Sequence, residues 1–265
     1  MSDIAIRVEN LSKQYRIGGP QARYKTIRES LTEAVQVPFR RLSSVLRGQS
    51  SAIANETIWA LKDVSFEVKH GEVAGIIGRS GAGKTSLLKV LSGLLSPKRG
   101  NVCLDGTDLQ CLSRRQIARC IAVVPQELTT PFAFSAWEMV MLGRTPHVRP
   151  LVGAGPHDRE VVQEKMALTG TLELASRPFI ELSGGEQQRV IIAMALAQEA
   201  EILLLDEPTV HLDISHQVEI LELIKRLNRQ QGLTVLAIIH DLNLAALYFD
   251  RLVLLNGGWF NYDLK

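Results

Sequence analysis

The sequence predicts an α/β fold with a mainly parallel central sheet, and three observations support this prediction. First, apolar runs of strand length recur at 73–77, 121–124, 202–205 and 234–239. Second, the runs are continuously apolar rather than alternating, which is typical of strands buried on both faces of a parallel sheet. Third, each run ends at a polar or glycine-rich segment, where parallel α/β sheets bind their ligands. We therefore expect a nucleotide-binding type of α/β protein.

The composition is that of an ordinary globular protein. Of 265 residues, 46% are hydrophobic and 22% are charged, which is enough apolar material for a full core. The net charge of +2 is too small to indicate a nucleic-acid partner. Cys103, Cys111 and Cys120 have no metal-binding spacing, which predicts reduced thiols. Neither a spanning apolar run nor a signal peptide is evident, so we expect a soluble, cytoplasmic chain.

Two segments interrupt the sheet pattern. Residues 127–181 contain helix-like stretches with proline and glycine breaks, which predicts an inserted helical subdomain. Residues 20–50 form a basic insertion with an apolar helical face. This insertion fits either a solvated surface helix or a basic amphipathic helix at the membrane surface. We expect one domain over 1–265, with a core of 1–126 and 182–265.

A glycine-rich loop follows the first apolar run. Its sequence, GRSGAGKT at 78–85, matches G-x-x-x-x-G-K-[ST] between a buried strand and a helical stretch. Glycines let backbone N–H groups turn toward phosphates, and the helix N-terminus adds positive partial charge. An ordinary turn with an exposed lysine is the competing interpretation. The nucleotide-binding candidates here are Gly78, Arg79, Ser80, Gly81, Ala82, Gly83, Lys84, Thr85 and Ser86.

Two adjacent carboxylates follow the third apolar run. Asp206 stands where a ligand of Mg²⁺, acting through water, is expected, and the Thr85 hydroxyl is a second candidate ligand. Glu207, one residue further on, is placed to orient or deprotonate an attacking water. Such a pair is also common at a solvated strand end. The phosphate loop in the same sheet favours the catalytic interpretation.

Residues 182–189 read LSGGEQQR, a stretch nearly confined to one superfamily. It occurs in order with GRSGAGKT, VVPQE, ILLLDEP, HLD and His240, spanning 73–243. This set resembles the ATP-binding cassette (ABC) ATPases. The resemblance implies a P-loop NTPase core of RecA-like type, an N-terminal antiparallel β portion and the inserted helical subdomain. It also implies ATP and Mg²⁺ as bound species.

The same resemblance implies roles for further residues. His240 is similar to the family's switch histidine, Gln126 to its lid glutamine, which also meets Mg²⁺, and Asp213 to its D-loop aspartate. With Lys84 and Glu207, His240 and Gln126 complete the catalytic candidates. Ser183, Gly184 and Gly185 would contact the γ-phosphate of a nucleotide held by the other subunit of a dimer. For adenine stacking, Tyr15 is favoured over Trp59, although either ring offers a suitable face.

The resemblance to sub-families differs between the two halves. Residues 1–105 resemble ATPases of polysaccharide and O-antigen exporters, whereas 127–265 resemble importers of iron-siderophore, haem and cobalamin. The family's permease docks on the surface that corresponds to 126–180, so metal-chelate uptake is favoured. The implied partners are a second ATPase subunit, transmembrane permease subunits and, for an importer, a substrate-binding protein. The implied location is peripheral, on the cytoplasmic face of the membrane.

Other function classes fit less well. An exporter ATPase is the nearest alternative. Translation factors of the family contain two cassettes, and chromosome-maintenance members contain long coiled coils, whereas this chain has one cassette and a short helical region. A small-molecule kinase could share the phosphate loop, but it would have no use for LSGGEQQR or His240.

Overall fold

The computed structural model describes residues 3–17, 56–128, 130, 132–149 and 153–264. The chain divides into two compact units, one of 1–13 and 60–265 and one of 14–59. Of the second unit only the strand ends at 14–17 and 56–59 are described. The predicted basic insertion at 20–50 and its amphipathic helix therefore lie outside the described residues.

The central sheet has six strands in the order β10-β9-β3-β8-β7-β6. All neighbouring pairs are parallel except β9 and β10, so the mainly parallel sheet is confirmed. The four predicted apolar runs all form strands in it. The bounds are Val73–Ile77 (β3), Ile121–Val124 (β6), Ile202–Asp206 (β7), Thr234–Ile238 (β8), Arg251–Asn256 (β9) and Trp259–Leu264 (β10).

A second sheet has the order β2-β1-β4-β5, and its β1–β4 and β4–β5 pairs are antiparallel. It confirms the antiparallel β portion that the family resemblance implies. The β1–β4 pair keeps a regular register from Ile6 to Glu9, and the register shifts between Glu9 and Ser12. The bounds are Ile4–Ile17 (β1), Glu56–Lys69 (β2), Arg99–Leu104 (β4) and Thr107–Asp108 (β5).

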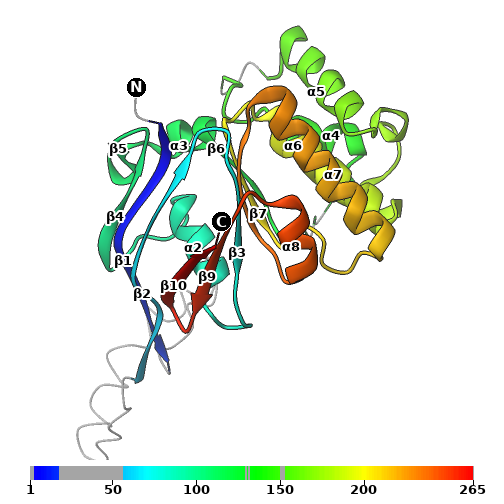
Figure 1. The fold of residues 1–265 in the computed structure, drawn as a ribbon. Helices are drawn as coiled ribbons and strands as arrows, with labels where there is room; N and C mark the ends of the chain where they lie inside the picture. The colour runs from blue at the N-terminus through cyan, green and yellow to red at the C-terminus, as the bar shows by residue number, and fades with distance from the viewer. Residues whose placement is uncertain (1–2, 18–55, 129, 131, 150–152, 265) are drawn as a thin grey trace, which may run out of the picture. The chain divides into compact units, whose positions relative to one another are not determined.

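The two faces of the central sheet pack against different layers. In β3, Ala74 and Ile76 belong to a core with α2 (Lys84–Leu91) and the antiparallel sheet. Val73 and Ile77 belong to a core with the helices of the other face. Both faces are thus removed from water, which explains the continuous hydrophobicity of the runs. Figure 1 shows α2 between the two sheets and α4 to α7 gathered on the other side.

Most helices begin at a polar capping residue. Ser113, Ser135 and Ser183 each form a capping box with the glutamine or glutamate three positions on, so the local sequence specifies these starts. Among the described residues, no helix has the length and apolar character that crossing a membrane requires. The remaining bounds are Arg114–Cys120 (α3), Ala136–Leu142 (α4), Pro156–Leu168 (α5), Gly184–Ala197 (α6), Ile214–Gln231 (α7), Leu242–Tyr248 (α8), and the 3-10 helices Leu109–Cys111 (η1), Leu172–Leu174 (η2) and Phe179–Glu181 (η3).

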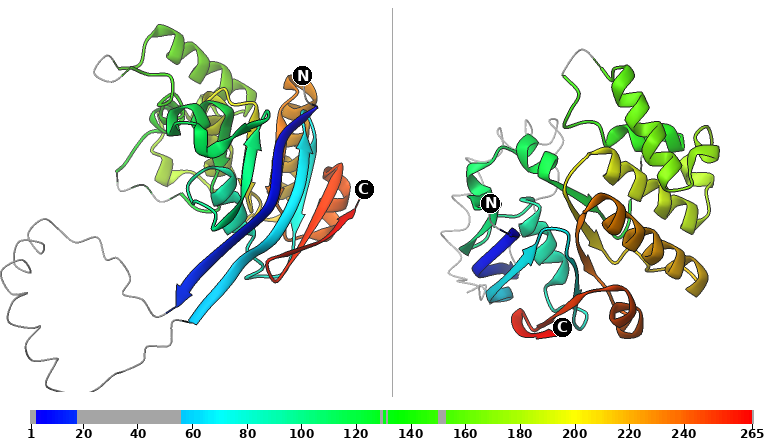
Figure 2. Two further views of the ribbon diagram at one scale, coloured as in Figure 1. Left: turned by 90° about the vertical axis from the view of Figure 1, so that its left-hand side faces the viewer. Right: turned by 45° about the horizontal axis from the view of Figure 1, so that its top comes forward.

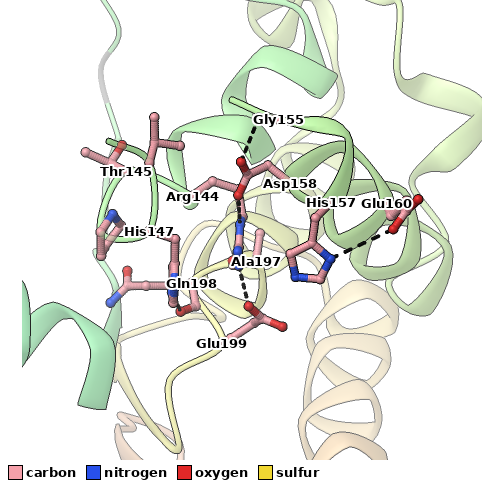
Figure 3. A network of polar contacts seen from close by, with 12 residues as sticks. Arg144, Thr145, His147, Gly155, His157, Asp158, Glu160, Ala197, Gln198 and Glu199 are labelled. Atoms are coloured by element: carbon pink, nitrogen blue, oxygen red, sulfur yellow. Dashed lines mark hydrogen bonds and ion pairs between the residues drawn. The ribbon is translucent and has the colours of Figure 1, made fainter. Parts of the chain in front are cut away.

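A buried arginine joins α4, α5 and α6. Figure 2 shows these helices from two further sides, and Figure 3 shows the contacts. Arg144 is only 2% exposed, and its guanidinium donates to Asp158 Oδ1 at 2.9 Å, Glu199 Oε2 at 2.6 Å and the Ala197 carbonyl at 2.7 Å. Asp158 also accepts the Gly155 N–H at 2.8 Å. Because the cation is buried, these partners are needed to offset its lost hydration.

The network shifts the protonation of both carboxylates. The hydrogen bonds from the Gly155 N–H and then from Arg144 lower the pKa of Asp158. For Glu199, burial raises the pKa, but the hydrogen bond and charge of Arg144 outweigh it and the net pKa is lowered. Carboxyl groups with a lowered pKa in the folded state stabilise the fold at neutral pH.

We predict that Arg144→Met lowers the free energy of unfolding by about 3 kcal/mol, because both carboxylates lose their cation. Urea unfolding measures this. The same change at exposed Arg159 is the control and should cost less than about 0.5 kcal/mol. The Arg144 effect should be complete above about pH 5 and shrink as pH falls through the lowered pKa values. Wild-type stability in Arg144→Met would contradict the assigned role.

Candidate active site

The carboxyl ends of four neighbouring strands meet at one edge of the central sheet. The register pairs Ile76 of β3 with Ile238 of β8, and Ile238 with Asp206 of β7. It also pairs Val124 of β6 with Leu205 of β7. Four predicted site residues lie within two positions of these strand ends: Gly78, His240, Glu207 and Gln126. Parallel pairing is therefore what brings them to a common edge.

The phosphate loop at 78–85 follows β3 and opens α2. Gly83 is the N-cap of α2 with φ of 95°, and a Cβ there would lie 2.0 Å from the Ala60 carbonyl oxygen. At Gly78 a Cβ would lie 2.1 Å from the Leu255 carbonyl oxygen. The loop is thus pressed against neighbouring backbone, and only glycine fits at these two positions.

Lys84 lies across the inside of this loop. Its side chain is buried, and Nζ donates to the Gly78 carbonyl at 2.7 Å and the Arg79 carbonyl at 3.2 Å. Burial lowers the pKa of Lys84, and the nearby carboxylates of Glu207 and Asp206 oppose that shift. A buried cation held by neutral carbonyls would gain from an anionic partner such as a phosphate.

Thr85 and Asp206 meet at the same edge. The Thr85 hydroxyl donates to Asp206 Oδ1 at 3.4 Å. Burial, and then the negative charge of Glu207, raise the pKa of Asp206, while the Thr85 hydrogen bond and the charges of Lys89 and Lys84 oppose the shift. A hydroxyl and a carboxylate held together, with excess negative charge, form the oxygen donor set that Mg²⁺ prefers. The residues present therefore fit this ion.

Glu207 and His240 contact each other directly. His240 Nε2 is hydrogen-bonded to Glu207 Oε1. The Glu207 side chain is 12% exposed, whereas that of His240 is 48% exposed. Glu207 adopts a φ of 53°, a left-handed conformation that is uncommon outside glycine. A carboxylate held by a histidine at the mouth of the site is suited to accept a proton from water.

Gln126 and Asp213 are two further predicted site residues. Gln126 is exposed after β6, and its neighbour Glu127 approaches His211 at 4.0 Å. Asp213 is the N-cap of α7, where its carboxylate accepts the His216 N–H at 2.9 Å. Tyr15 and Trp59 belong to the second compact unit, so the choice between them for adenine stacking stays a prediction.

The segment Ser183, Gly184 and Gly185 lies at the N-terminus of α6. α6 packs on the face of the sheet opposite to α2, the helix of the phosphate loop. The Ser183 hydroxyl and N–H donate to Glu186 Oε2 at 2.7 and 2.8 Å, and these bonds lower the pKa of Glu186. Within the described part of the chain, no hydrogen bond joins this segment to residues 78–85. Ser183 and Gly184 are exposed and Gly185 is buried, and a helix start of this kind offers N–H groups suited to a phosphate.

Sequence reasoning missed two residues that hold α6, one near each of its ends. His216 contacts Asp213, and its ring lies against Gly185. The spacing of Asp213 and His216 in a helix start could have indicated their contact. Arg144, in contrast, has partners on other helices that sequence spacing does not indicate.

Comparisons with known proteins agree with this geometry. The family model described as ABC transporter matches residues 61–210. The chain is 41% identical over 213 residues to the ferric enterobactin transport ATP-binding protein FepC of Escherichia coli, covering 80% of this chain and 79% of that one. It is 45% identical over 207 residues to the hemin import ATP-binding protein HmuV of Gloeobacter violaceus, covering 76% and 74%. A solved dimeric ATP-binding cassette in a post-hydrolysis state, bound to ADP and Pi, superposes with a TM-score of 0.76 at 28% identity, covering 98% of each chain.

We predict different costs for alanine at two glycines of the loop. Gly78→Ala places a Cβ against backbone, so unfolding free energy without nucleotide should fall by about 3 kcal/mol. Gly81 has φ of 78° but open space around its Cβ position, so Gly81→Ala should cost only about 1 kcal/mol. Thermal or urea unfolding of the nucleotide-free protein measures both. Equal costs would contradict the close approach at Gly78.

Proposed function

This chain belongs to the ABC transporter family as an ATP-hydrolysing subunit, and we propose that it powers the uptake of a metal chelate. The observation that best supports the cargo class is its similarity to import proteins, which extends over most of this chain and of theirs. The resemblance of 127–265 to metal-chelate importers points the same way. We also propose that 127–181 is the helical subdomain on which the permease docks.

ATP binding rests on the phosphate loop. Backbone N–H groups of 78–85 and the α2 N-terminus would receive the phosphates, and Lys84 would turn from its carbonyl partners to the β- and γ-phosphates. The loss of two hydrogen bonds from Lys84 to neutral carbonyls is offset by hydrogen bonds to phosphate, in which both donor and acceptor are charged. Tyr15 is the proposed stacking partner of adenine.

Hydrolysis is an in-line attack of water on the γ-phosphate. Glu207 orients the water and accepts its proton, while His240 holds the Glu207 carboxylate and faces the γ-phosphate. Gln126 lies at the end of the neighbouring strand, where it would meet the attacking water when the site closes. Thr85, Asp206 and Gln126 would hold Mg²⁺, which supplies charge neutralisation at the phosphates.

The site is completed by a second copy of the chain. Ser183, Gly184 and Gly185 of one subunit would face the γ-phosphate held by the other, and Asp213 would lie at the same interface. The helix start offers N–H groups and positive partial charge to the phosphate. We further propose permease subunits and a substrate-binding protein as partners, with the chain peripheral on the cytoplasmic face of the membrane. Closure on ATP and opening after hydrolysis would drive the permease.

Removing the proposed base should separate binding from turnover. Glu207→Gln is expected to bind ATP and accumulate as a dimer, while hydrolysis falls by about a hundredfold or more. Size-exclusion chromatography with ATP and a phosphate-release assay measure the two effects. Glu201→Gln, the same change at an exposed glutamate just before β7, should behave as wild type. Near-normal hydrolysis in Glu207→Gln would show that another group accepts the proton.

The proposed cargo class is tested in cells. Deleting the gene should abolish uptake of a radiolabelled ferric siderophore, haem or cobalamin, because these chelates cannot cross the membrane unaided. The wild-type gene should restore uptake and the Glu207→Gln gene should not. Intact uptake of all these chelates, with loss of a surface polysaccharide, would contradict import and support the exporter alternative.

A further inference from the structure

His216 joins the starts of two helices, α6 and α7, that lie side by side (Figures 1 and 2). It lies in the first turn of α7. Its Nδ1 is 2.8 Å from Asp213 Oδ1, and the same oxygen accepts the His216 backbone N–H at 2.9 Å. These bonds, the backbone one first, lower the pKa of Asp213. The ring is therefore held in one orientation by the residue that caps its own helix.

The opposite edge of the ring lies against Gly185 of α6. A Cβ built on Gly185 would lie 2.4 Å from His216 Cδ2 and 3.0 Å from Cγ. Gly184, the preceding residue, lies less closely against Leu212, since a Cβ on Gly184 would lie 3.4 Å from Leu212 Cδ2. Gly185 thus allows α6 to approach His216 more closely than any other residue would, whereas a Cβ at position 184 would be in ordinary van der Waals contact.

Further contacts extend this junction. Gln217 Nε2 donates to the Leu212 carbonyl at 2.8 Å, which fixes the chain just before α7. One turn further along, Arg189 of α6 approaches Glu219 of α7 at 3.3 Å. These contacts therefore hold two segments together as one packed block, made of residues 183–185 and 212–216.

The 212–216 part of this block begins only a few residues after Glu207. The connecting segment holds two left-handed residues, Glu207 with φ of 53° and His211 with φ of 62°. Such residues keep their conformation only where the surroundings enforce it. The segment from Glu207 to Asp213 therefore joins the Glu207–His240 pair to the contact between His216 and Gly185.

We propose that His216 is a positioning residue that couples the loop after Glu207 to the Gly184 and Gly185 segment offered to the partner's nucleotide. The role rests on the proposed function, because it concerns the site formed between two copies. Its contribution to the fold itself is small: Asp213 is 67% exposed, and exposed ion pairs stabilise little. The effect of losing His216 should therefore appear in ATP-driven dimerisation, not in ATP binding by one subunit.

The contact is tested first, on nucleotide-free protein. Gly185→Ala should lower the melting temperature, because the new Cβ meets the His216 ring. In a His216→Ala background the same Gly185→Ala change should have little further effect, since the obstacle is gone. If Gly185→Ala lowers the melting temperature equally in the wild-type and His216→Ala backgrounds, the ring does not lie on Gly185 and the proposal is overturned.

The coupling is tested next, in the Glu207→Gln background that retains ATP. Adding His216→Ala should raise the ATP concentration needed for half-maximal dimerisation by about tenfold, because the ring no longer holds the 183–185 segment in place. Binding of a fluorescent ATP analogue to dilute, monomeric protein should be unchanged. His216→Asn keeps a donor for Asp213 but loses the ring edge, so it should lie between His216→Ala and the parent.

Controls separate the possible failures. His157→Ala removes an exposed histidine of α5 and should match the parent in every assay. If His216→Ala does not fold, His216→Asn provides the same comparison. Parent-like dimerisation in both His216 variants would overturn the coupling while leaving the proposed function intact. Failure of Glu207→Gln itself to dimerise with ATP would refute the shared site, and with it both proposals.

Discussion

Parallel pairing of four strands buried on both faces is the constraint on which this protein depends. β3, β8, β7 and β6 are neighbours in register, so their carboxyl ends lie at one edge. Because apolar layers cover both faces, polar side chains are accommodated only where the strands end. The phosphate loop, His240, the acidic pair and Gln126 are consequently gathered there from distant parts of the sequence.

Burial opposes the charged forms of two titratable groups at this edge. Lys84 is buried against neutral carbonyls, and burial lowers its pKa. Burial and the adjacent Glu207 raise the pKa of Asp206. The charged forms of both residues are therefore less stable here than they would be in water. Bound phosphates and a divalent cation would compensate these charges, which connects the electrostatics of the site with nucleotide binding.

α6 connects this chemistry with the rest of the molecule. At its C-terminal end, Arg144 bonds to Ala197 and Glu199 and holds α4 and α5 to the helix. At its N-terminal end, Gly185 lies against His216 of α7. A helix of 14 residues is about 21 Å long, so α6 spans the distance between these two junctions. The 183–185 segment and the Arg144 network therefore lie at opposite ends of one helix.

Local patterns in the sequence determined much of this protein: the buried strands, the serine-capped helix starts and the glycine-rich loop. Each depends on neighbouring residues alone, as with Ser183 and Glu186 or with the apolar run before Asp206. Only the tertiary structure decided why Gly78 must lack a Cβ, what neutralises Arg144 and where the His216 ring lies. Those features depend on Leu255, Glu199 and Gly185, residues distant in sequence whose approach is set by packing of the whole sheet and its helices.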